Sequence, residues 1–184
     1  DKIIFRNKAK LNDDIYVTGN LGDSYTGLRI LKNKIRINQS LKKYFIMKYF
    51  LPELQSKLIK KLLFIANTSI DLSDGLVADL EKLINKQNFS YKIYLNTIPI
   101  SKNLEKLLSV KKLKKIDFIS RGDDYQILFT AKSSKSRIIN KTAKSLGIKI
   151  SKIGKICSNI EKTQIIDQKG YIIPQKNLGY YHKF

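Results

Sequence analysis

The stretch Ile70-Asp71-Leu72-Ser73-Asp74-Gly75-Leu76-Val77-Ala78-Asp79-Leu80 places two acids and a hydroxyl around a glycine turn. An apolar stripe at helical spacing follows, so a helix is predicted to begin at this turn with Leu76, Leu80, Leu83 and Ile84 on one face. Ser73 or Asp74 is suited to cap the free N–H groups there, and the positive end of the helix dipole also accepts phosphate. Asp71 and Asp74 are suited to Mg²⁺, which takes one or two carboxylates beside water and phosphate oxygens. The spacing alone permits either a metal–nucleotide site or a plain helix cap.

Three further segments accompany this stretch along the chain. They are Asp14-Ile15-Tyr16-Val17-Thr18-Gly19 with Leu21-Gly22-Asp23-Ser24, then Gly122-Asp123-Asp124-Tyr125-Gln126-Ile127-Leu128-Phe129, and finally Gly179-Tyr180-Tyr181-His182. In this order the four segments resemble the thiamine-monophosphate kinase family, whose members carry Asp-Ile/Leu-Ser-Asp-Gly-Leu before a helix that ends in Asp-Leu. The resemblance covers nearly the whole chain but only the C-terminal half of the family's protein.

The resemblance implies a fold and an activity. The fold is α+β, a mixed β-sheet covered by helices, as in the C-terminal domain of the aminoimidazole ribonucleotide synthetase-like superfamily. The activity is ATP-dependent phosphorylation of thiamine monophosphate to thiamine diphosphate, with Mg²⁺ ions neutralising the charge that develops. A homodimer that pairs through the N-terminal halves is also implied.

The same resemblance implies roles for individual residues. Asp71 and Asp74 are expected to bind metal, Ser73 to contact ATP, and Asp123 and Tyr180 to face thiamine phosphate. No catalytic base is expected, because a phosphate nucleophile is already ionised. The segment Arg121-Gly122-Asp123-Asp124-Tyr125 departs from the family's Gly-Gly-Glu-Asp-Tyr at two positions: an arginine replaces a glycine, and Asp123 is one methylene shorter than glutamate.

Composition and charge set the broad class. With 184 residues and 42% hydrophobic content, the chain is large enough for one well-formed core, so a single domain over 1–184 is expected. Residues 1–12 are expected to be a linker from an N-terminal ATP- and Mg²⁺-binding half, since the chain starts at Asp1 rather than at methionine. The lone cysteine, Cys157, fits a reducing compartment, and no apolar run of spanning length occurs, so a cytoplasmic protein without membrane contact is expected.

The net charge of +21 has two interpretations. Lysines spread along the whole chain are typical of solvated faces, whereas a nucleic-acid surface would cluster its charges, favour arginine and add stacking aromatics. We therefore expect no nucleic-acid partner, although the positive field would attract ATP and phosphomonoesters. A basic nucleic-acid-binding module, another ATP-dependent member of the same superfamily and a non-catalytic scaffold remain the alternative hypotheses.

Periodicity along the chain predicts interleaved strands and helices. Strands are expected at 15–17, 91–95, 126–130 and 148–156, with a hairpin over 163–173. Helices are expected from Ser24, over 45–50, from Pro52, after a Ser101 cap, and over 133–146 with Gly147 as the C-terminal stop. The acids of the central stretch are expected to face an open nucleotide cleft. The chain by itself is expected not to turn over substrate, because the family's other metal-binding acids lie in the N-terminal half.

Overall fold

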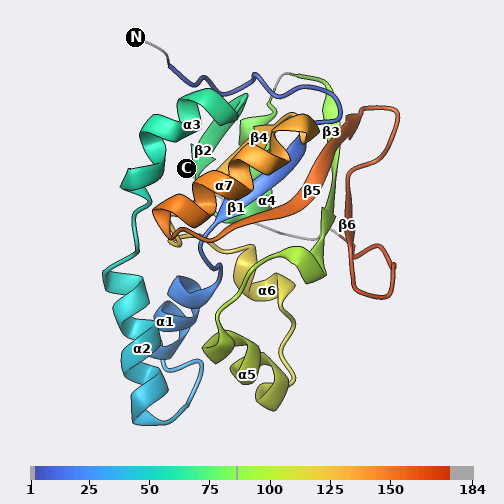
Figure 1. Cartoon of the computed structure of the whole chain (residues 1–184). Coiled ribbons are helices and arrows are strands. Elements are labelled where there is room, and N and C mark those ends of the chain that lie inside the picture. The colour runs from blue at the N-terminus through green and yellow to red at the C-terminus, as the bar shows by residue number, and fades with distance from the viewer. Residues whose placement is uncertain (1–2, 86, 175–184) are drawn as a thin grey trace, which may run out of the picture.

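Six strands form one mixed sheet in a computed structural model that describes residues 3–85 and 87–174. The strand order is β2-β4-β1-β5-β3-β6 (Figure 1). Every neighbouring pair is antiparallel except β3 and β6, which are parallel. The strands are β1 (Asp14–Thr18), β2 (Thr68–Asp71), β3 (Phe89–Tyr94), β4 (Ile127–Ala131), β5 (Ile150–Ser158) and β6 (Gln164–Ile166).

Alternating side chains of the central strands belong to two different cores. In β1, Ile15 and Val17 join the larger apolar cluster, whereas Tyr16 between them joins the cluster on the opposite face. In β4, Leu128 and Phe129 divide in the same way. This follows from the two-residue period of a strand, and it shows that both faces of the sheet are buried.

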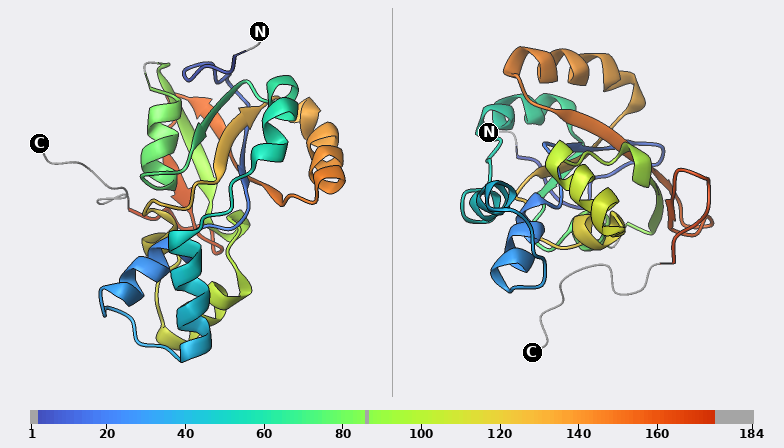
Figure 2. Two further views of the ribbon diagram at one scale, coloured as in Figure 1. Left: turned by 90° about the vertical axis from the view of Figure 1, so that its left-hand side faces the viewer. Right: turned by 90° about the horizontal axis from the view of Figure 1, so that it is seen from below.

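Helices cover each face of the sheet. On one face lies α4 (Leu76–Leu83), whose Leu76, Leu80 and Leu83 are at most 1% exposed. On the other face lie α3 (Ile59–Ile65) and α7 (Ser136–Leu146), which pack against Tyr16 and Phe129 (Figures 1 and 2). Short 3₁₀ turns precede or connect some of these helices and strands, at η1 (Ser56–Leu58), η2 (Leu95–Thr97) and η3 (Ser133–Lys135).

A separate group of helices lies beyond one end of the sheet (Figure 1). It consists of α1 (Asp23–Leu31), α2 (Gln39–Phe50), α5 (Lys102–Lys111) and α6 (Ile116–Ile119). These helices share a third apolar core around Phe45, Leu104 and Phe118, each fully buried.

The strands expected at 15–17, 91–95, 126–130 and 148–156 are confirmed within two residues at each end. The helix expected over 45–50 begins earlier, at Gln39, and β2 and α6 were not predicted. Ser101 accepts a hydrogen bond from the Leu104 N–H at 3.0 Å, and Gly147 ends α7 in the left-handed conformation, as expected. The next helix is present, but its expected start at Pro52 is wrong: helical structure begins at Ser56, and Leu54 is 67% exposed. The α+β mixed sheet is confirmed.

Residues 3–12, the described part of the segment expected to be a linker, are hydrogen-bonded to the domain and packed against it. The Asn7 N–H donates to the Leu83 carbonyl at 3.1 Å, and the Thr68 hydroxyl donates to the Phe5 carbonyl at 2.7 Å. Ala9 is buried in the larger core. Across the described residues, every helix is too short or too polar to cross a bilayer.

Candidate functional site

The polar motifs singled out in the sequence meet at one edge of the sheet. Strand β1 pairs with β4 and β5 antiparallel, and β2 pairs with β4 in the same sense. The loops after β1 and β2 and the loops before β4 and β5 therefore emerge together, facing the α1–α2 helices (Figure 1). Pairing of Asp71 with Ile127 brings the central stretch beside the 120–126 segment.

The 71–75 loop and the 120–126 segment are joined through their backbones, an arrangement we call the clasp. The Leu72 N–H donates to the Gln126 carbonyl at 2.8 Å, and the Tyr125 N–H donates to the Leu72 carbonyl at 2.9 Å. The Asp123 N–H donates to the Ser73 carbonyl at 3.0 Å. Contact is so close that a Cβ on Gly122 would lie 1.7 Å from the Ser73 carbonyl oxygen. Glycine is therefore required at position 122.

Two residues of the clasp adopt an unusual backbone conformation. Asp123 and Tyr125 have φ values of 70° and 51°, in the left-handed region that side chains with a Cβ seldom occupy. Such residues cost on the order of 1 kcal/mol each and persist where neighbouring contacts enforce them, often at functional sites. Here the hydrogen bonds to Ser73 and Leu72 provide that enforcement.

The turn that leads into α4 is held by Asp79, a residue in the first turn of the helix. One Asp79 oxygen, Oδ2, accepts the N–H groups of Ser73, Asp74 and Gly75 at 2.9, 2.9 and 3.1 Å. The residue at the cap position is Gly75, which has no side-chain cap. The prediction that Ser73 or Asp74 caps this helix is therefore wrong: their own N–H groups are held by Asp79, and neither side chain accepts from the first turn of α4.

Asp74 and Asp123 lie close enough to affect one another. The Asp74 side chain is 23% exposed and forms an ion pair with Lys82. Burial, reinforced by the nearby Asp74 charge, raises the pKa of Asp123. Asp71, at the end of β2, is exposed, and its side chain makes no hydrogen bond or ion pair with another described residue. The loop thus presents one paired and one unpaired carboxylate.

Asp124 connects the clasp to the helical group. Its carboxylate accepts the Gly22 N–H at 2.8 Å and the Ser24 N–H at 3.4 Å, at the N-terminus of α1. Burial raises the pKa of Asp124 to about 8, despite these N–H donors. Neither Asp23 nor Ser24 provides a side-chain cap for α1; Asp23 accepts from Ser101 at 2.6 Å and from Tyr44 at 2.8 Å. Burial raises the pKa of Asp23 as well.

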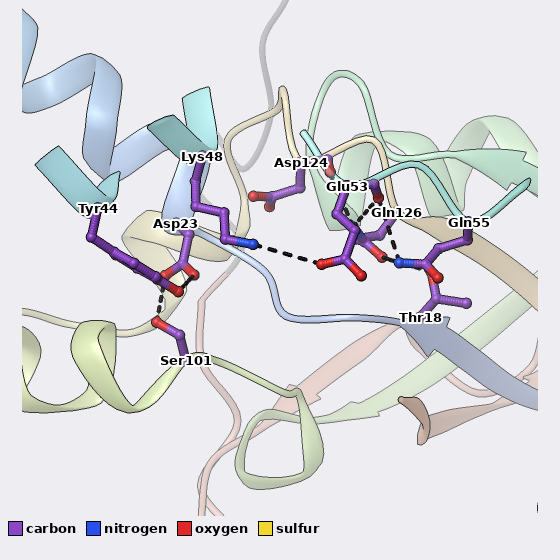
Figure 3. Close-up of polar contacts among 9 residues, drawn as sticks. All are labelled: Thr18, Asp23, Tyr44, Lys48, Glu53, Gln55, Ser101, Asp124 and Gln126. Carbon is purple, nitrogen blue, oxygen red and sulfur yellow. Dashed lines mark hydrogen bonds and ion pairs between the residues drawn. The ribbon is translucent and has the colours of Figure 1, made fainter. Parts of the chain in front are cut away.

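A polar pocket of about 190 Å³ opens beside Asp124 (Figure 3). Figure 3 shows the Lys48–Glu53 ion pair, 3.6 Å long, between Asp23 on one side and Gln126 on the other. The Gln126 amide oxygen accepts from Thr18 at 2.9 Å and from Gln55 at 3.2 Å. This volume is below the roughly 300 Å³ of a typical ligand pocket. Asp71, Ser73, Asp74 and Asp123 are not part of its lining, so the cleft expected around Asp71 and Asp74 is not this pocket.

The donor set fits a partial magnesium site. No group of three or more acidic, histidine or cysteine side chains within residues 3–85 and 87–174 is arranged to hold a metal ion. Asp71 and Asp74 remain as the two hard oxygen donors of the loop, and Mg²⁺ bound with phosphate commonly takes one or two carboxylates. The residues present therefore fit a metal whose other ligands are phosphate, water or groups outside the described residues.

The structure brings four of the five expected site residues to one edge. Asp71, Ser73 and Asp74 lie in the 71–75 loop of the clasp, and Asp123 lies in the 120–126 segment. Tyr180 lies outside the described residues. Sequence reasoning missed the parts played by Asp79, Lys82 and Asp124. An acid in the first turn of a predicted helix suits the positive end of the helix dipole, but this signal does not reveal that Asp79 binds the backbone N–H groups of the preceding turn.

Comparisons with known proteins identify similar chains. No protein-family model matches the sequence. The thiamine-monophosphate kinase of Buchnera aphidicola subsp. Schizaphis graminum is 34% identical over 180 residues, which cover 97% of this chain and 55% of the relative. The crystal structure of thiamine-monophosphate kinase from Stenotrophomonas maltophilia K279a superposes with a TM-score of 0.78 and 27% identity, over 91% of this chain and 53% of that one. AaThiL complexed with AMPPCP and TMP superposes with a TM-score of 0.77 and 24% identity, over 97% of this chain and 54% of that one. The chain spans about half the length of the relatives it matches.

Proposed function

Because this chain belongs to the thiamine-monophosphate kinase family, with the fold of the C-terminal domain of the aminoimidazole ribonucleotide synthetase-like superfamily, we propose that it supplies the C-terminal part of an ATP-dependent kinase. The reaction proposed is transfer of the γ-phosphoryl group of ATP to thiamine monophosphate, giving thiamine diphosphate. The N-terminal half of the relatives, which this chain does not match, would supply the remaining metal-binding acids.

The clasp is the observation that carries this proposal. It holds the proposed metal loop and the proposed substrate loop together through three backbone hydrogen bonds of 2.8 to 3.0 Å. Phosphoryl transfer between two anions depends on positioning and charge neutralisation rather than on covalent chemistry by the protein. Two loops fixed side by side, each with acids at its surface, suit that task.

The residues would divide the work as follows. Asp71 and Asp74 would hold Mg²⁺, which neutralises phosphate charge and lines up the reacting groups when bound. The Ser73 hydroxyl, half-buried and without a described hydrogen bond, would contact ATP. Asp123 and Tyr180 would face thiamine monophosphate. The complex of AaThiL with AMPPCP and TMP supports a nucleotide and a second ligand on this fold.

We further propose a homodimer in a cytoplasmic setting, as the family resemblance implies. Measurement of the molecular mass of the kinase in solution by light scattering tests the proposed homodimer. A mass of twice the chain mass is expected, and a monomer would overturn this part of the proposal.

The test of the function is a steady-state assay of thiamine diphosphate formation. Asp74→Asn should lower kcat by about 10²-fold or more, because the metal loses a charged ligand while the loop backbone keeps its hydrogen bonds. Glu161→Gln is the matched control, since Glu161 pairs with Lys92 beyond the opposite end of β5 and should leave kcat unchanged. Near-normal turnover by Asp74→Asn, or no turnover by the wild-type chain when it is joined to the N-terminal half that the relatives carry, would refute the proposal.

A further inference from the structure

The carboxylate of Asp79 is buried, and both of its oxygens accept hydrogen bonds from nearby residues of the same segment. Its side chain is 0% exposed. Oδ2 accepts three successive backbone N–H groups, and Oδ1 accepts the Lys82 ammonium at 3.1 Å. Successive N–H groups that converge on one point form an anion-binding concavity, and here a carboxylate of the same chain occupies it.

We propose that Asp79 is the positioning residue of the metal loop and that Lys82 is its partner, each fixing a different part of that loop. Asp79 fixes the backbone from Ser73 to Gly75, and Lys82 bridges from Asp79 to the carboxylate of Asp74. The link to metal binding rests on the proposed function, whereas the control of loop geometry does not.

The electrostatics of this arrangement determine how phosphate can approach. The N-terminus of a helix normally attracts phosphate through its free N–H groups. At α4 the Gly75 N–H, together with the Ser73 and Asp74 N–H groups of the preceding turn, is bound to Asp79, so a phosphate that approaches this turn meets a carboxylate. A cation held by Asp71 and Asp74 would offset this negative charge and so favour phosphate binding at the turn.

The positive charge of Lys82 should affect metal binding in the opposite direction to the negative charge of Asp79. Its ammonium contacts Asp74, so a divalent cation bound by Asp74 must compete with that positive charge. Removal of the Lys82 charge should strengthen metal binding, whereas removal of the Asp79 charge should weaken it. A purely structural role for the two residues does not predict opposite effects.

The first readout is amide hydrogen exchange of residues 73–75, measured by NMR. Asp79→Asn keeps the shape of the side chain but removes the charge that strengthens its three hydrogen bonds. Exchange at these three amides should accelerate by at least about 10-fold, since a loss of about 1.4 kcal/mol corresponds to that factor. Glu81→Gln, an exposed acid on the same helix, is the control and should leave them unchanged. Unaltered exchange in Asp79→Asn would overturn the proposal.

The second readout is the affinity for Mn²⁺ in the presence of AMPPCP, measured by electron paramagnetic resonance. Asp79→Asn should weaken Mn²⁺ binding by about 10- to 100-fold, the usual effect of losing a residue that orients metal ligands. Lys82→Met should strengthen it several-fold. A weakening in both variants, or in neither, would overturn the positioning roles. A wild-type protein that binds no Mn²⁺ with AMPPCP would instead refute the proposed function, and hydrogen exchange would then decide the positioning proposal alone.

Discussion

Asp124 makes the stability of this protein depend on pH across the neutral range. Its carboxyl is buried at the N-terminus of α1, and burial raises its pKa from 3.8 to about 8. Between these two values the native state holds a proton that the unfolded state has lost. Stability from this group is therefore complete below about pH 4 and disappears as pH rises through about 8.

The size of the effect follows from the shift. One proton changes the free energy of unfolding by about 1.4 kcal/mol per pH unit, so Asp124 alone should lower it by about 3 kcal/mol between pH 5 and pH 7. The pKa values of Asp23 and Asp123 are also raised by burial, and they add losses of the same sign. A comparison of two variants is needed to separate Asp124 from these neighbours.

Urea unfolding at a series of pH values provides that comparison. Asp124→Asn retains an amide oxygen for the Gly22 N–H but cannot titrate, so its free energy of unfolding should fall less steeply with pH than that of the wild type. The difference in slope should approach about 1.4 kcal/mol per pH unit. Asp117→Asn, a change at an exposed acid of α6, should keep the wild-type slope. Equal slopes for wild type and Asp124→Asn would refute the reasoning.

Two further substitutions test the clasp and the core. Gly122→Ala should separate the two loops, because its Cβ would lie 1.7 Å from the Ser73 carbonyl oxygen; a crystal structure or NMR spectrum in which the 2.8 to 3.0 Å clasp hydrogen bonds persist would contradict this. Phe129→Ala should lower the free energy of unfolding by about 3–5 kcal/mol, since Phe129 is fully buried and stacks on Tyr16 with ring centroids 5.3 Å apart; a loss below about 1 kcal/mol in urea unfolding would show that the site collapses around the cavity.

Local sequence signals predicted much of the fold. The alternation through Ile15, Tyr16 and Val17 marked a strand, and Ser101 and Gly147 marked a helix start and a helix end. The same kind of signal failed at Pro52, because a proline suited to the first turn of a helix also suits the extended segment that lines the polar pocket. Propensity does not distinguish these two settings.

The site was predictable in its residues but not in its geometry. The motifs around Asp74 and Asp123 were recognisable in the sequence. A local sequence pattern does not indicate, however, that two loops about 50 positions apart are hydrogen-bonded to each other. The role of Asp79 was hidden for a related reason. Its partners are backbone N–H groups, which leave no trace in side-chain patterns.

The most direct test of the account is the metal dependence of nucleotide binding at the clasp. Calorimetric titration of AMPPCP into the kinase should show binding that requires Mg²⁺ and that weakens at least about 10-fold in Asp74→Asn. Equal affinity with and without Mg²⁺, or equal affinity of the wild type and Asp74→Asn, would contradict the claim that the acids of this loop hold the cation that neutralises phosphate.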